Sequence, residues 1–166
     1  FVFDEVPHLP GLAVIHRSLR ETFTAELGGD VEFCAESPNL SQFKDPGYDG
    51  LLRHYFSQKY AHKTPDLNVA VMQPSLEFLL HDDGALFPGV PIVFCGLDSS
   101  YLERHPLPPN ITGVAVKRAY APTVDIALQL QPNTRHLFVV GGTAEFDRLI
   151  QAIARRDLLP YERRLQ

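Results

Sequence analysis

The stretch from residue 65 to residue 98, PDLNVAVMQPSLEFLLHDDGALFPGVPIVFCGLD, constrains the fold more than any other part of the chain. It holds two compact apolar runs, Asp66–Met72 and Pro91–Cys95, separated by a short helix-like segment, Leu76–Leu80. Strands that are apolar on both faces and alternate with helices are typical of a parallel sheet covered on both sides. In such sheets ligands bind beyond the carboxyl ends of the strands. We therefore expect function in the residues that directly follow these two runs.

The same alternation extends along the whole chain. Further strands are expected at 1–3, 31–35, 111–116 and 135–140, and further helices at 10–27, 48–62, 99–105, 121–130 and 144–156. Right-handed crossovers place the first five strands in one parallel sheet, for which the flavodoxin-like order 2-1-3-4-5 is the usual solution. The last helix–strand–helix part is too small for a sheet of its own. It is either a sixth strand of the same sheet or the first unit of a second lobe.

Composition excludes several classes of protein. The apolar share of 45% is enough for an ordinary core. A net charge of -5 without a basic stripe argues against a general nucleic-acid binder. No apolar run reaches the ~18 residues that a membrane span requires. Cys34 and Cys95 show no metal-binding spacing and lie in strands that the expected order separates, so both are predicted to be free, buried thiols.

Polar side chains follow the carboxyl ends of the predicted strands. The candidate ligand-binding residues of this group are Glu5, His8, Gln73, Pro74, Ser75, Gly96, Asp98 and Ser99. A few polar groups with one or two charges around an apolar crevice suit a small polar molecule. Three of these residues also have an alternative, structural interpretation. Ser75 is a natural N-cap for the helix after it, and Asp98 or Ser99 for the next one.

The sequence patterns of common enzymes are missing. The chain has no GxxxxGK[ST] phosphate loop and no GxSxG nucleophile elbow. The turn Gly141-Gly142-Thr143 lies between a predicted strand and a helix, where it is either a plain tight turn or an anion site at a helix N-terminus. A receiver domain needs an aspartate after its third strand, but that strand ends Val71-Met72-Gln73. The seven histidines are scattered, so no metal site is predicted, and no cofactor either.

Four phrases of the sequence carry a family resemblance. PDLNVAVMQPSLEFLL (65–80), LFPGVPIVFCGLD (86–98), PPNITGV (108–114) and LQPNTRHLFVVGG (130–142) resemble the type I periplasmic-binding-protein-like domains. The similarity is greatest to the ABC-transporter substrate-binding-protein-like group, which bacteria also use as extracytoplasmic sensor domains of membrane histidine kinases. It spans nearly the whole chain.

The resemblance implies a fold of two Rossmann-like lobes with a ligand in the cleft between them. Residues 1–116 would form the first lobe, with five parallel strands and flanking helices. Residues 117–166 would begin the second lobe, which would be only partly present. By position, Lys117 would lie at the hinge, Gly142 and Thr143 would face the cleft from the second lobe, and the strand-end residues 5–8, 73–75 and 96–98 would face it from the first.

The function implied is non-enzymatic binding of an unidentified small molecule outside the cytoplasmic membrane. In a sensor the domain would be membrane-tethered and would signal to an attached histidine kinase. One alternative is the solute-binding component of an ABC transporter, whose partner would be a permease. Another is a flavodoxin-like enzyme or nucleotide binder. If strands of the second lobe are missing, apolar surface would be exposed, and a homodimer would cover it.

Overall fold

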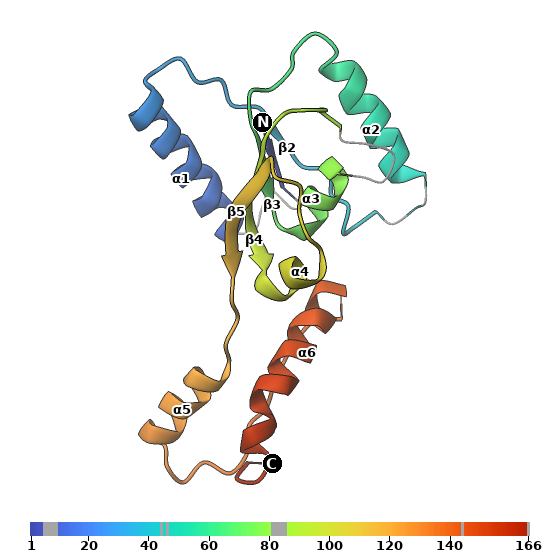
Figure 1. Cartoon of the computed structure of the whole chain (residues 1–166). Coiled ribbons are helices and arrows are strands. Elements are labelled where there is room, and N and C mark those ends of the chain that lie inside the picture. The colour runs from blue at the N-terminus through green and yellow to red at the C-terminus, as the bar shows by residue number, and fades with distance from the viewer. Residues whose placement is uncertain (5–9, 44, 46, 81–85, 144, 166) are drawn as a thin grey trace. The chain divides into compact units, whose positions relative to one another are not determined.

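The computed structural model describes residues 1–4, 10–43, 45, 47–80, 86–143 and 145–165. It has an α/β fold with a five-stranded, all-parallel sheet of order β2-β1-β3-β4-β5, flanked by helices (Figure 1). The predicted order is thereby confirmed. The elements are β1 (Val2–Phe3), α1 (Pro10–Leu27), β2 (Ala35–Glu36), α2 (Tyr48–Lys59), β3 (Asn68–Val71), α3 (Gln73–Leu80), β4 (Ile92–Asp98), α4 (Ser99–Arg104), β5 (Ile111–Val116), α5 (Ala121–Leu130), α6 (Glu145–Leu158) and a 3-10 turn, η1 (Leu159–Tyr161).

The two faces of the sheet have separate cores. Alternate side chains of a strand point to opposite faces, and α1 lies on one side of the sheet while α2 and α3 lie on the other (Figure 1). On the first face, α1 contributes a single fully buried side chain, Leu12, which joins Val2, Val69 and Val71. This helix covers only part of its face, since Val114 of β5 keeps 68% of its surface exposed.

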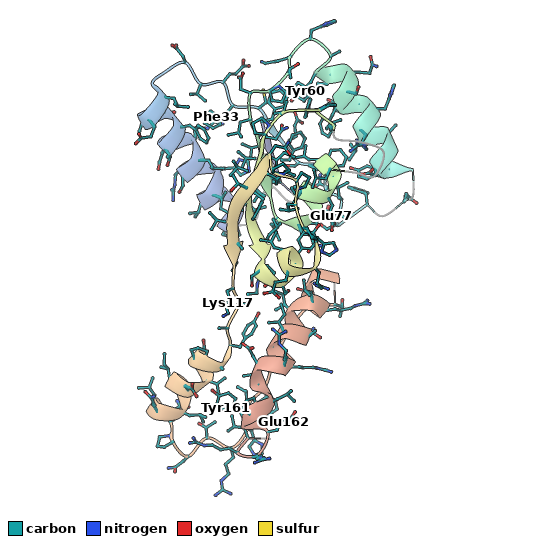
Figure 2. All side chains as sticks on the ribbon, viewed as in Figure 1. Phe33, Tyr60, Glu77, Lys117, Tyr161 and Glu162 are labelled. Atoms are coloured by element: carbon teal, nitrogen blue, oxygen red, sulfur yellow. The ribbon has the colours of Figure 1, made fainter. Side chains whose placement is uncertain are left out.

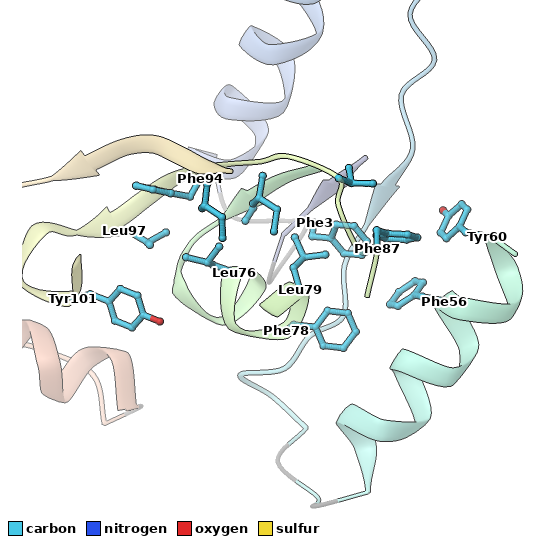
Figure 3. Packing of buried hydrophobic residues seen from close by; sticks show 14 residues of the cluster. Phe3, Phe56, Tyr60, Leu76, Phe78, Leu79, Phe87, Phe94, Leu97 and Tyr101 are labelled. Atoms are coloured by element: carbon cyan, nitrogen blue, oxygen red, sulfur yellow. The ribbon is translucent and has the colours of Figure 1, made fainter. Parts of the chain in front are cut away.

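The opposite face carries the larger core, which is rich in aromatic residues (Figure 3). Phe3 is fully buried there and packs edge-on against Phe56 of α2, with ring centroids 5.7 Å apart. Leu76 and Leu79 of α3 fill the space beneath the sheet and are 0% and 1% exposed. A fully buried leucine contributes roughly 1.5–3 kcal/mol of hydrophobic stabilisation. The core therefore fixes the strands whose carboxyl ends build the site.

Several predicted boundaries were wrong. The second strand was expected at 31–35, but β2 covers only Ala35–Glu36, because just these residues pair with β1. The helix expected at Leu76–Leu80 begins three residues earlier, at Gln73. The fourth strand continues past Gly96 to Asp98, because a bulge between Cys95 and Leu97 lets its pairing with β5 resume.

The chain divides into two compact units, Phe1–Val116 and Lys117–Gln166. The second unit contains α5, α6 and η1, and its small core includes Val124, Leu128 and Leu165. Tyr161, labelled in Figure 2, ties η1 to α5 by donating a hydrogen bond to the carbonyl oxygen of Ala121, 3.1 Å away.

A strand was predicted at 135–140 in the second unit, and this prediction was wrong. The segment forms no strand, because no other described segment pairs with its backbone. Within the described part of the chain, no helix is long and apolar enough to cross a membrane.

Candidate ligand-binding site

The first strand ends in a buried carboxylate. Asp4 directly follows β1 and is 2% exposed. Its backbone N–H donates to the carbonyl oxygen of Glu36 over 3.0 Å, which continues the β1–β2 pairing by one residue. Strand β1 lies between β2 and β3, where the chain's connections reverse direction across the sheet. Asp4 thus occupies the topological switch point, where open α/β sheets bind their ligands.

Two side chains hold the Asp4 carboxylate. The Nε2 atom of His16, on α1, lies 2.5 Å from Oδ2. The Oγ of Ser37, just beyond β2, donates a hydrogen bond to Oδ1. Burying a carboxylate without donors is strongly unfavourable, so these two contacts explain how Asp4 is tolerated inside the fold.

The imidazole of His16 links the buried carboxylate to solvent, because 27% of its side chain is exposed. With Nε2 engaged by Asp4, Nδ1 is the ring atom left for a ligand. A neutral ring that donates from Nε2 presents Nδ1 as an acceptor, and a protonated ring presents it as a donor. Asp4 and Ser37 thereby orient a group that can bind either a hydroxyl or an anionic ligand.

The turn after β3 lies against the bulge in β4. Met72 has a φ of 71°, in the left-handed region that a side chain disfavours, and Gly96 has a φ of 77°. The N–H of Met72 donates to the carbonyl oxygen of Cys95 over 2.8 Å. A non-glycine residue in this conformation costs on the order of 1–3 kcal/mol, and such residues cluster at binding sites and switch regions.

The turn at Met72 explains why α3 begins earlier than expected. Pro74 fits the first turn of the helix, where a backbone N–H has no helical partner in any case. Ser75 is therefore the third residue of α3 and not its N-cap, so that prediction was wrong. Ser75 is 0% exposed, and among the described residues its Oγ finds no hydrogen-bond partner. Gln73 instead faces outward and donates to Glu77 over 2.9 Å.

At the end of β4, the prediction that Asp98 caps the following helix is confirmed. Its Oδ1 accepts hydrogen bonds from the backbone N–H and the Oγ of Ser100, at 3.0 and 2.6 Å. Asp98 is therefore the N-cap of α4. Its side chain is 8% exposed, and Ser99 beside it is half-buried.

The other predicted site residues lie either outside the described part of the chain or in the second unit. Glu5 and His8 lie outside the described residues. Lys117, Gly142 and Thr143 are exposed residues of the second unit.

The turn 141–143 makes a poor anion site. The carbonyl oxygen of Gly142 accepts a hydrogen bond from Gln151 over 2.7 Å, which holds the turn against α6. A Cβ on Gly142 would overlap the carboxylate of Asp147. Because a negative charge lies at the turn, an anion there would be repelled.

The sequence interpretation missed all three residues of the cluster. Asp4 directly follows the first predicted strand, but the candidate residues there began at Glu5. His16 had a detectable signal: it lies four residues after Leu12 and three before Leu19, on the inward stripe of α1, where a polar side chain needs a buried partner. For Ser37 the sequence contains no such signal, because its place beside Asp4 follows from the pairing of β2 with β1.

Two adjoining cavities of about 330 and 590 Å³, which were not predicted, lie within the second unit. Leu137, Val139 and Gly141 line both of them. Across the described ranges, no three His, Cys, Asp or Glu side chains gather as metal ligands. Both cysteines are free and half-buried.

The chain was compared with protein-family models, with curated proteins and with solved structures. No family model, curated protein or solved structure matches it. Function is therefore inferred from the geometry above and from the resemblance of the sequence phrases.

Proposed function

We propose that this chain is a small-molecule-binding domain of the type I periplasmic-binding-protein-like class, used as the extracytoplasmic sensor domain of a bacterial histidine kinase. Residues 1–116 would be its first lobe, and residues 117–166 would begin its second. The ligand would bind at the carboxyl edge of the sheet, and its binding would be signalled to the attached kinase.

The cluster of Asp4, His16 and Ser37 carries the proposal. It is a polar constellation built from β1, α1 and the end of β2, and it lies at the edge of the sheet where this class of fold binds ligands. Core packing alone does not account for a buried carboxylate here, since an apolar residue at this position would avoid the cost of desolvation. Met72 directly follows β3, the strand beside β1, and its strained backbone also favours the carboxyl edge of the sheet as the place where a ligand binds.

Two alternatives share parts of this evidence. A solute-binding protein of an ABC transporter would use the same edge, and the sequences that flank the domain distinguish it: a transmembrane helix and a kinase indicate a sensor. A flavodoxin-like nucleotide or flavin binder is favoured by the sheet order 2-1-3-4-5. Its expected anion site at Gly141-Gly142-Thr143 loses support because Asp147 lies beside Gly142.

A thermal-shift screen tests the proposal. The panel would contain amino acids, small organic acids, aromatic compounds, nucleotides and flavin. A ligand at ~100 times its dissociation constant stabilises the folded state by roughly 2.7 kcal/mol. For a chain of this size, that corresponds to a rise in Tm of about 5–10 °C.

Variants then locate the site. His16→Gln should abolish the shift given by a hit, whereas His54→Gln, an exposed histidine on α2, should leave it unchanged. A shift from nucleotides or flavin alone would favour the flavodoxin-like alternative. A hit whose shift survives His16→Gln would place the ligand elsewhere and contradict the proposed site.

A further inference from the structure

The carboxylate of Asp4 carries a negative charge that no lysine or arginine of the described residues balances. Among the ion pairs of these residues, Asp4 pairs with His16, whereas the two lysine pairs engage Glu36 and Glu32. Its other partner is the uncharged hydroxyl of Ser37. Asp4 is 2% exposed, and buried charges are normally paired with an opposite charge. With a neutral imidazole at His16, the cluster therefore has one negative charge in excess.

The surroundings of His16 offer little that would hold an anionic ligand. Residues 1–116 contain fifteen Asp and Glu but only seven Lys and Arg. Arg20 lies one turn after His16, but its guanidinium is stacked over the ring of Phe33, with Cζ 4.6 Å from the ring centroid. Arg17 follows His16 directly, and adjacent residues of a helix do not face each other. His16 is also the seventh residue of α1, beyond the first turn in which the helix dipole favours anions. An anion at the ring would thus face the buried carboxylate with no cation of α1 to offset it.

The free ring nitrogen of His16 suits a donor that carries a positive charge. Nε2 lies 2.5 Å from Oδ2 of Asp4, so a neutral ring donates there and presents Nδ1 as an acceptor. We propose that Nδ1 binds a protonated amine, which makes small cationic amines the ligand class of this site. The ammonium group donates to Nδ1 and supplies the positive charge that the buried carboxylate lacks. This inference rests on the proposed function, because it names the ligand of the same site.

The charge of Asp4 sets the expected selectivity. It lies one imidazole ring from the charged group of the ligand, where it attracts an ammonium group and repels a carboxylate. An amine should therefore bind at least about tenfold more tightly than a carboxylic acid with the same skeleton. Matched pairs of probes provide this comparison: putrescine and succinate, phenethylamine and phenylacetate, and ethanolamine and glycolate.

Thermal-shift titration of the 166-residue chain tests the inference. Each probe would be added up to about 10 mM, which reaches dissociation constants in the millimolar range, with about 0.15 M salt to screen exposed charges. At least one amine should raise the Tm, and its acid partner should require at least about ten times the concentration for the same rise.

Two lysine variants test the role of charge. His16→Lys places a cation beside Asp4 within the chain itself, so it should abolish the response to the amine. His54→Lys, at an exposed histidine of α2, is the matched control and should keep the response. Far-UV circular dichroism would verify that both variants fold, and His16→Gln provides a second, uncharged variant.

The outcomes separate this inference from the proposed function. Amines that give no shift, or acids that shift the Tm of the wild type as strongly as their amine partners, would overturn the amine class. If an acidic or neutral compound of the wider panel then shifts the wild type but not His16→Gln, the site itself is retained. An amine whose shift survives in both His16 variants binds elsewhere, and would overturn the amine class and the site together.

Discussion

The contact between Asp4 and His16 permits a quantitative test by a double-mutant cycle. Asp4→Asn keeps the size of the side chain but replaces an acceptor oxygen by an NH₂ group, so one of the two donors at the site loses its acceptor. His16→Ala removes the imidazole, whose Nε2 lies 2.5 Å from Oδ2. Asp4 is 2% exposed, so water cannot readily replace the lost partners.

The magnitudes follow from that burial. A hydrogen bond to a charged group contributes about 1.5–3 kcal/mol to stability. Asp4→Asn should therefore lower the free energy of unfolding by roughly 2–4 kcal/mol, since it affects the contacts with both His16 and Ser37. His16→Ala should cost about 1–3 kcal/mol, because the carboxylate keeps Ser37 and the vacated space admits water. The double variant should be less destabilised than the sum of both by roughly 1–2 kcal/mol.

Urea unfolding followed by circular dichroism measures these values, and amide signals from β1 and β3 assign the loss to the first unit. With a slope of about 1–3 kcal/mol per molar urea, Asp4→Asn should lower the midpoint by roughly 1–2 M. Asp30→Asn, at an exposed residue, is the control and should change stability by less than about 0.5 kcal/mol. Strict additivity of the two substitutions, or an Asp4→Asn variant as stable as the wild type, would refute the cluster.

Three further predictions concern the first unit. Gly113→Ala should destabilise the protein by about 1–3 kcal/mol or more, because a Cβ there would approach Cγ of the Phe94 ring to 2.6 Å; a urea midpoint equal to that of the wild type would contradict this. Burial raises the pKa of the Cys95 thiol, so iodoacetamide should alkylate Cys95 more slowly at pH 8 in the native protein than in urea, and equal rates would count against it. Burial, reinforced by the nearby charge of Glu77, raises the pKa of Tyr101 to about 12. The stability associated with Tyr101 should thus be complete below its ordinary pKa of 10.0 and decline as the pH rises towards 12. Because the chain has six tyrosines, the test is the difference in absorbance at 295 nm between the folded wild type and Tyr101→Phe, and a difference that appears already near pH 10 would exclude this.

The pattern of elements was predictable because it depends on local periodicity. The spacing of apolar residues gave α1 its observed bounds, Pro10–Leu27. The buried apolar runs and the handedness of crossovers gave five parallel strands in the order 2-1-3-4-5. The capping role of Asp98 was also predictable, because an N-cap contacts a residue only two positions away.

The errors arose where distant parts of the chain decide the outcome. The segment at 135–140, RHLFVV, has the composition of a strand, but a strand forms only when a partner backbone lies beside it. The length of β2 was set by its register with β1, and the start of α3 by the left-handed turn at Met72. None of these follows from the residue types of the segment alone.

By itself, the sequence determined that this chain alternates strands and helices, forms a parallel sheet and carries polar residues beyond its strand ends. The tertiary structure decided which of these polar residues meet. His16 reaches Asp4 because α1 packs on the face of β1 to which that side chain points, and Ser37 joins them through the β1–β2 register. The physical reason is that periodicity is encoded within a few residues, whereas a buried polar contact depends on register and packing between segments that lie far apart in the chain.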